Sequence, residues 1–230
     1  MSEAKNINKP VLDIAGAAER LKSVVTHTPL QFNANLSRKY QCNVYLKRED
    51  LQIVRSYKLR GAYNMMHQLS PELLAKGVVC ASAGNHAQGF AYSCKKLGVK
   101  GVVFMPIPSP QQKVNQTKMF GDEFVEVVLV GDTFDDAYKA AVDFCNSNGA
   151  AFVHPFDDPD VIAGQGTIGM EILRQHPGPI HAVFVAVGGG GLISGVAAYI
   201  KAVRPDVKVI GVQVRDKHSI NIGYVFKTRL

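Results

Sequence analysis

Residues 182–200 read A-V-F-V-A-V-G-G-G-G-L-I-S-G-V-A-A-Y-I, and this uncharged stretch decides the fold. It is about as long as a membrane-spanning helix, which needs roughly 20 apolar residues. Four consecutive glycines, residues 188–191, stand at its middle, and each glycine costs about 1 kcal/mol in a helix interior. A strand over 183–187, a glycine turn and a helix over 192–203 fit the stretch better. We therefore predict no membrane span.

The same alternation of short apolar runs and longer amphipathic stretches recurs along the chain. Strands are predicted over residues 44–47, 78–81, 102–105, 126–130, 151–154, 183–187 and 207–214. Helices are predicted over residues 11–25, 60–69, 86–97, 111–120, 133–146, 166–175 and 192–203. Strands that are apolar throughout and are joined by helices form parallel sheets covered on both faces. The predicted fold class is α/β, with three layers and open parallel sheets.

The spacing of the predicted elements also suggests two domains. We predict a smaller domain over residues 54–153, flanked by two segments of a larger one, 1–53 and 154–214. Residues 215–230 do not continue the pattern and are assigned to an atypical tail.

Composition limits the classes of function. The 230 residues carry a net charge of +7, yet no run of Lys or Arg exceeds two, whereas a nucleic-acid surface needs clustered cations. The four cysteines form no C-x-x-C pair and no metal-like spacing, so we predict reduced thiols and no metal site. The N-terminus M-S-E-A-K-N has no apolar signal segment. These features predict a cytoplasmic protein that binds neither nucleic acid nor membrane.

The four glycines also suggest a ligand. A strand that ends in glycines and opens a helix offers free backbone amides and the positive end of the helix dipole, which together favour a phosphate. A plain strand–helix turn would need only one or two glycines. The dinucleotide pattern G-x-G-x-x-G occurs elsewhere, from Gly164 to Gly169, after D-D-P-D-V-I-A. Because no strand precedes it, we interpret it as the entry to a helix.

A second stretch, A-S-A-G-N-H-A-Q-G over residues 81–89, follows a predicted buried strand. Its small residues allow a ligand to approach the backbone, and Ser82, Gly84 and the following amides suit a carboxylate. Asn85 can donate or accept a hydrogen bond without a change of charge. The alternative, that this loop only caps the next helix, stays open. His86 by itself is more typical of a helix start than of a catalytic base.

The third stretch, I-V-R-S-Y-K-L-R-G-A-Y-N over residues 53–64, places Lys58 among aromatic and basic neighbours. An amine becomes a nucleophile when it is desolvated or lies near positive charge, which Tyr57, Arg55 and Arg60 are candidates to provide. Ligands of parallel sheets bind at the carboxyl ends of strands, and that rule selects all three stretches. An amine next to a phosphate site indicates pyridoxal 5′-phosphate bound as an imine.

Three motifs carry a family resemblance: E-D-L-Q-I-V-R-S-Y-K-L-R-G-A (49–62), S-A-G-N-H (82–86) and G-G-G-G-L (188–192). In this order and at these separations they resemble the serine/threonine dehydratases, which have the two-domain PLP fold type II, like the tryptophan synthase β subunit. H-T-P-L (27–30) and A-G-Q-G-T (163–167) resemble that family too. The sequence around Lys58 is most similar to that of the biosynthetic-type threonine dehydratases (threonine ammonia-lyases).

The resemblance implies roles for individual residues. Lys58 is expected to form the Schiff base and to remove the α-proton, and Asn85 to bond the ring oxygen of the cofactor. The phosphate is expected on Gly188, Gly189, Gly190, Gly191 and Leu192. The substrate carboxylate is expected on Ser82, Ala83, Gly84, Asn85 and His86.

The reaction implied is the conversion of L-threonine to 2-oxobutanoate and ammonia in isoleucine biosynthesis, with L-serine as a secondary substrate. Two alternatives stay open: a serine dehydratase or racemase, and a truncated, non-catalytic fragment that binds the cofactor. In the family the chain continues well beyond the segment that matches residues 208–214, so the resemblance implies an incomplete larger domain. An unpaired strand edge and exposed apolar surface are then expected. A homo-oligomer is implied only by the resemblance.

Overall fold

The computed structural model of the chain describes residues 12–213. The predicted tail 215–230 and the outermost residues of the predicted helix 11–25 and strand 207–214 lie outside the described residues. Within 12–213 the strands belong to three sheets, of two, four and two strands. The boundaries of the two predicted domains stay a prediction.

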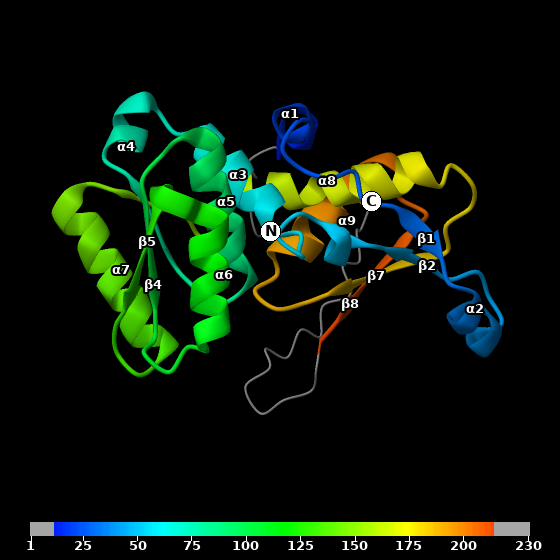
Figure 1. Cartoon of the computed structure of the whole chain (residues 1–230). Coiled ribbons are helices and arrows are strands. Elements are labelled where there is room, and N and C mark those ends of the chain that lie inside the picture. The colour runs from blue at the N-terminus through cyan, green and yellow to red at the C-terminus, as the bar shows by residue number, and fades with distance from the viewer. Residues whose placement is uncertain (1–11, 214–230) are drawn as a thin grey trace, which may run out of the picture.

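The four-stranded sheet is parallel throughout and has the order β5-β4-β3-β6. Its strands are β3 (Val78–Ala81), β4 (Gly101–Met105), β5 (Val125–Leu129) and β6 (Ala151–Phe152). The helices around it are α3 (Lys58–His67), α4 (Pro71–Ala75), α5 (Asn85–Leu97), α6 (Gln111–Gly121) and α7 (Phe134–Asn148). Figure 1 shows this sheet with α5 and α6 on one side and α7 on the other.

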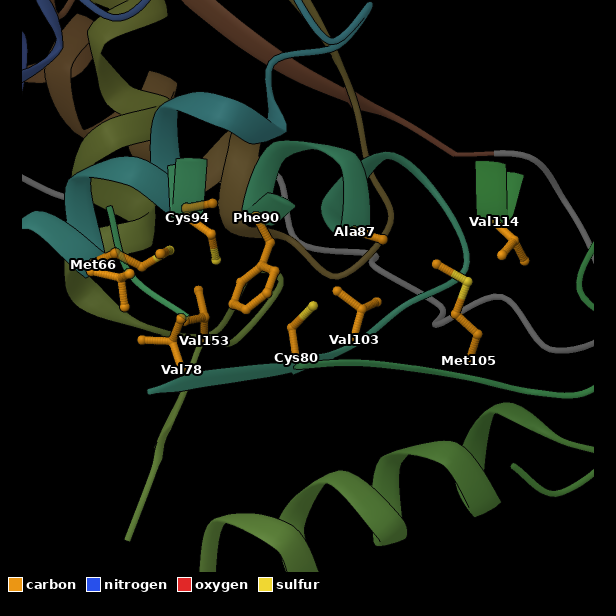
Figure 2. Packing of buried hydrophobic residues seen from close by; sticks show 12 residues of the cluster. Met66, Val78, Cys80, Ala87, Phe90, Cys94, Val103, Met105, Val114 and Val153 are labelled. Carbon is orange, nitrogen blue, oxygen red and sulfur yellow. The ribbon is translucent and has the colours of Figure 1, made fainter. Parts of the chain in front are cut away.

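Both faces of this sheet are packed. On one face the side chains of Val78 and Cys80 point toward Phe90 and Cys94 of α5, as Figure 2 shows. On the opposite face Val79, with neighbours on β4, packs against small residues of α7. Alternate residues of a strand point to opposite faces, so a strand that is buried throughout must be covered twice. The predicted α/β class and the three layers are confirmed for this sheet.

The other half of the fold contains the sheet of β7 (Ala182–Ala186) and β8 (Lys208–Val212), which are parallel. The helices α8 (Pro159–Gln175) and α9 (Gly191–Val203) pack against one face of it. On the other face Phe184, Ile210 and Val212 are 68%, 37% and 52% exposed. The expectation of exposed apolar surface is confirmed, and within the described residues only one face of this sheet is covered.

The N-terminal segment departs most from the predictions. It contains α1 (Ile14–Leu21), β1 (Leu30–Phe32), α2 (Ala34–Tyr40), β2 (Tyr45–Lys47) and the 3-10 turn η1 (Glu49–Leu51). The strand β2 pairs antiparallel with β1, which was not predicted, so the prediction of parallel sheets throughout is wrong here. The helices α2 and α4 were not predicted either. A second 3-10 turn, η2 (Asp122–Phe124), precedes β5.

The predicted helix entry at Gly164 is also wrong. Helix α8 begins at Pro159, and the Asp158 side chain accepts hydrogen bonds from the amides of Asp160 and Val161. Gly164 therefore lies inside α8, where a Cβ would be 2.5 Å from the carbonyl oxygen of Arg60. The glycines of this motif allow helices to cross closely; they do not form a nucleotide loop. Of the helices that the structure describes, none combines the length and apolar character that crossing a membrane requires.

Candidate active site

Lys58 is the first residue of α3, and its side chain turns into the protein. Its Nζ donates a hydrogen bond of 2.6 Å to the carbonyl oxygen of Pro155, which follows β6. The same nitrogen lies 5.5 Å from the centre of the Tyr57 ring. Lys58 belongs to none of the ion pairs found among residues 12–213. The amine is therefore held by a neutral carbonyl and no carboxylate stabilises its charged form.

Burial lowers the pKa of the Lys58 amine to about 8. Desolvation penalises the ammonium form relative to the neutral amine. With such a pKa about a tenth of the amine is neutral at pH 7, far more than for an ordinary lysine. The geometry thus supports the prediction of a nucleophilic lysine.

The neighbouring arginines do not provide that environment, contrary to the prediction. Arg60 is fully buried and bonds Glu49 at 2.7 Å and Glu171 at 2.6 Å, and Lys47 completes the group through Glu171. Residues two positions apart on a helix point about 200° apart, so Arg60 is directed away from Lys58. Arg55 is exposed. Burial alone accounts for the lowered pKa of Lys58.

The glycine loop, residues 188–191, joins β7 to α9. At three of its positions a side chain is excluded, each time for a different reason. A Cβ at Gly189 would collide with the ring of Phe156, and one at Gly191 would be 2.5 Å from the carbonyl oxygen of Phe156. Gly190 has a φ of +91°, which L side chains avoid. At Gly188 and Gly190 a Cβ would meet nothing within 4 Å, so the loop is open on that side. Its amides at the start of α9 have no intrahelical acceptor.

Lys58 and the glycine loop line one narrow hollow, here called the Lys58 pocket. Its lining residues are Tyr57, Lys58, Pro155, Phe156, Gln165, Ala186, Gly188, Gly189, Gly190, Gly191 and Leu192. An amine and a set of free amides on the wall of one pocket fit an aldehyde that carries a phosphate. The residues present therefore fit pyridoxal 5′-phosphate.

The loop of residues 82–86 lies near Lys58 but does not line the pocket. Gly89, one turn into α5, approaches so closely that a Cβ would be 2.9 Å from the carbonyl carbon of Lys58. Ser82 accepts a hydrogen bond from the amide of Gly84, and Asn85 starts α5 with an exposed side chain. Gly84 precedes the helix without a side-chain cap, so Asn85 is not the cap residue. Its side chain remains available to a ligand.

His86 is buried, and its Nε2 donates to the carbonyl oxygen of Val153 at 2.9 Å. Burial lowers the pKa of His86 to about 3, so the ring is neutral near pH 7. A neutral ring that is bonded to a carbonyl of the core is not a catalytic base. Only the backbone amide of His86 is left for the predicted carboxylate site.

The sequence interpretation missed Pro155, Phe156 and Gln165 as members of the pocket. Pro155 lies 97 residues from Lys58 along the chain, so only the tertiary fold brings the two together. Gln165 belongs to A-G-Q-G-T, which was noted as a family motif without a role. A larger hollow, of about 790 Å³, lies at the amino ends of β3, β4 and β5, and none of the predicted site residues lines it.

A lysine of lowered pKa that shares a pocket with a loop of free backbone amides, in an α/β protein, fits one class: enzymes that condense an amine with a phosphorylated aldehyde. A profile of the family described as "Pyridoxal-phosphate dependent enzyme" matches residues 21–227. The chain belongs to this family, and its fold is PLP fold type II. The predicted resemblance and the predicted cofactor, pyridoxal 5′-phosphate, are confirmed.

Individual proteins of known name are similar to the chain. The chain is 58% identical over 203 residues to "L-threonine dehydratase biosynthetic IlvA" of Bacillus subtilis (strain 168), covering 88% of this chain and 48% of that protein. The structure of the processed form of threonine deaminase isoform 2 from Solanum lycopersicum matches with a TM-score of 0.84 at 48% identity, over 88% of this chain and 54% of that one. Maize serine racemase matches with a TM-score of 0.83 at 30% identity, over 87% and 60%. The chain thus spans about half the length of the curated relatives it matches.

Proposed function

We propose that the chain carries the cofactor site of a threonine ammonia-lyase, which converts L-threonine to 2-oxobutanoate and ammonia, with L-serine as a slower substrate. The observation that carries the proposal is the Lys58 pocket, in which an amine with a pKa of about 8 shares a wall with the open glycine loop. We assign the reaction to isoleucine biosynthesis, and the similar proteins carry the word "biosynthetic" in their names.

Three groups of the chain would hold the cofactor. The free amides of the glycine loop and Leu192 bind the phosphate, where the positive end of α9 adds a favourable dipole. The Nζ of Lys58 is the amine that would hold the aldehyde. Asn85, exposed at the start of α5, supplies a neutral hydrogen bond to the ring oxygen.

The chemistry then depends on a proton held at Lys58. Pyridoxal 5′-phosphate, when bound, supplies the electron sink for charge that develops on the α-carbon of an amino acid. The backbone amides of residues 82–86 hold the substrate carboxylate at the positive end of α5. When the amino group of the substrate takes its place on the aldehyde carbon, the freed Lys58 amine would accept the α-proton at Nζ, and its pKa of about 8 leaves a usable neutral fraction. As an ammonium it again donates to the carbonyl oxygen of Pro155.

A second candidate is a serine dehydratase or racemase, favoured by the match to maize serine racemase at a TM-score of 0.83. The two candidates share Lys58 and the glycine loop and differ in substrate and product. Rates with L-threonine and L-serine, together with the chirality of the recovered serine, separate them. A faster rate with threonine and no D-serine supports the proposal.

The direct test uses the purified chain with pyridoxal 5′-phosphate. Borohydride reduction followed by peptide mass spectrometry is expected to find a phosphopyridoxyl group on Lys58, and threonine is expected to yield 2-oxobutanoate. Lys58→Ala should lose both signals, while Lys76→Ala, a lysine outside the Lys58 pocket, should lose neither. Label on Lys58 without product would support instead the fragment that binds the cofactor and turns nothing over.

We also propose a cytoplasmic location and self-association. The exposed apolar side chains of β7 and β8 support association, because a contiguous apolar patch favours contact with another surface. Light scattering after size exclusion measures the mass directly, and a strictly monomeric chain would contradict the second part.

A further inference from the structure

Two buried side-chain oxygens have no hydrogen-bond partner within residues 12–213: Ser56 Oγ and Gln165 Oε1. Ser56 stands two residues before Lys58, and Gln165 lines the Lys58 pocket. A buried acceptor without a partner costs about 1–3 kcal/mol, so native proteins keep such groups for a reason. Gln165 thus brings an amide with unused hydrogen-bonding capacity to the Lys58 pocket, where a bound ligand can contact it.

Gln165 is the better placed of the two. It is 1% exposed and lies on α8, where the close approach of α3 fixes it: a Cβ at Gly61 would collide with its Nε2. On the other side α9 begins, and a Cβ at Gly195 would be 2.6 Å from the amide of Gly166. Gln165 therefore lies between the first turns of α3 and α9. The positive ends of both helices stabilise an anion at this place.

We propose that the side-chain amide of Gln165 contacts the phosphate of the bound ligand and selects the phosphorylated aldehyde over its unphosphorylated form. This inference rests on the proposed function and adds a specificity residue to it. Gln165 and the glycine loop line the same pocket, so a phosphate bound on the loop shares that pocket with the Gln165 amide. A phosphate oxygen accepts hydrogen bonds and cannot satisfy the unpartnered Oε1, so the contact uses Nε2, which a half-turn of the amide about Cγ–Cδ presents as the donor.

The proposal predicts that a single variant keeps or gains thermal stability while it loses affinity for pyridoxal 5′-phosphate. Gln165→Met keeps the length of the side chain and removes the unpartnered oxygen, so the melting temperature of the cofactor-free chain should stay level or rise. The same change removes a hydrogen bond to a charged group, so affinity for pyridoxal 5′-phosphate should fall about ten- to a hundredfold. A residue with a structural role alone would lower stability and leave the choice of ligand unchanged.

The experiment titrates wild type, Gln165→Met and Gln165→Glu with pyridoxal 5′-phosphate and with pyridoxal, following absorbance and borohydride trapping on Lys58. The preference for the phosphorylated form should fall in Gln165→Met and fall further in Gln165→Glu, whose carboxylate repels phosphate. Gln175→Met is the matched control, because Gln175 lies on the same helix, outside the pocket, and its amide already bonds the carbonyl oxygen of Thr28. It should lose stability and keep the preference.

The outcomes separate the two proposals. If wild type is trapped on Lys58 and the Gln165 variants keep the wild-type preference, the inference is wrong and the proposed function stands. If wild type binds neither aldehyde at Lys58, both fall together. Gln165→Asn, which keeps the amide but shortens the side chain, replaces Gln165→Met should that variant not fold, and it should lose the preference as well.

Discussion

The two parallel sheets of the molecule are built from the same alternation of strand and helix, yet they are covered differently. In the four-stranded sheet Val79 and Val103 are fully buried, because helices pack on both faces. In the sheet of β7 and β8, Phe184 is 68% exposed, because α8 and α9 cover one face. A sequence pattern therefore sets the strands, whereas the stability of each region depends on how many faces are covered.

The Lys58 pocket lies between the two regions and takes one group from each. Lys58 starts α3, which packs with α5 beside the four-stranded sheet, whereas the glycine loop follows β7. The well-packed region holds the amine, and the half-covered region holds the glycine loop. Four predictions test this contrast.

The largest contrast is expected between two phenylalanines. Phe90→Ala empties a fully buried position of α5 and should lower the free energy of unfolding by about 3–5 kcal/mol. Phe184→Ala removes a ring that is mostly exposed in the single chain and should change it by less than about 0.5 kcal/mol at concentrations where the chain is monomeric. Urea denaturation measures both. Equal losses in the two variants would show that the face of β7 and β8 is covered in solution.

The second prediction concerns the charge cluster that ties α3 to α8. Arg60→Met leaves the Glu49 carboxylate without its ion-pair partner and Glu171 with Lys47 alone, and removing one member of a buried pair costs about 3–5 kcal/mol. Thermal unfolding of the variant should also broaden as the two regions lose their link. The matched control is Arg48→Met, whose partner Asp50 is exposed, and it should melt like wild type. A wild-type melt for Arg60→Met would contradict the role of the cluster.

The third prediction is a loss of stability in acid. Burial holds the pKa of His86 at about 3, while in the unfolded chain it is about 6.5. Between these values the unfolded chain binds the additional proton, so stability must fall as the pH drops from 6.5 toward 3. His86→Gln should flatten this slope in urea midpoints measured at several pH values. His154, whose pKa is also lowered by burial, leaves part of the slope in place.

The smallest effect is expected within the glycine loop. Gly190→Ala forces a Cβ onto a φ of +91° and should cost about 1–2 kcal/mol. Gly188→Ala meets no atom within 4 Å and should leave the melting temperature unchanged, although its methyl group enters the space proposed for the phosphate. Calorimetry compares the two variants. A larger loss for Gly188→Ala would contradict the open face of the loop.

Much of the fold was predictable from local sequence. Strand β3 matches the predicted range 78–81, because a continuous apolar run between helices has few other solutions. The start of α8 was missed although Asp158-Pro159 carries a normal signal, a capping side chain followed by proline at the first position. Strand β1 has only three residues and a partner in β2, so local periodicity could not reveal it.

The motifs of the site could be predicted from the sequence, whereas the contacts between them could not. The amine and the glycine loop were found, because residue type and spacing carry their chemistry. The carbonyl of Pro155 that accepts from Lys58, and the ring of Phe156 above Gly189, depend on packing between segments far apart in the chain. The unpartnered oxygen of Gln165 is visible only when every neighbour is known.

The first turn of α3 carries both Lys58 and Arg60 on opposite sides. Since Arg60 is bonded to Glu171 of α8, we expect this turn and α8 to move together, so that Lys58 and Gln165 keep a constant separation. Opening or closing of the pocket would then come from the segment of Pro155 and Phe156 or from the glycine loop. The Lys58 nitrogen would be the fixed point relative to which the rest of the pocket rearranges.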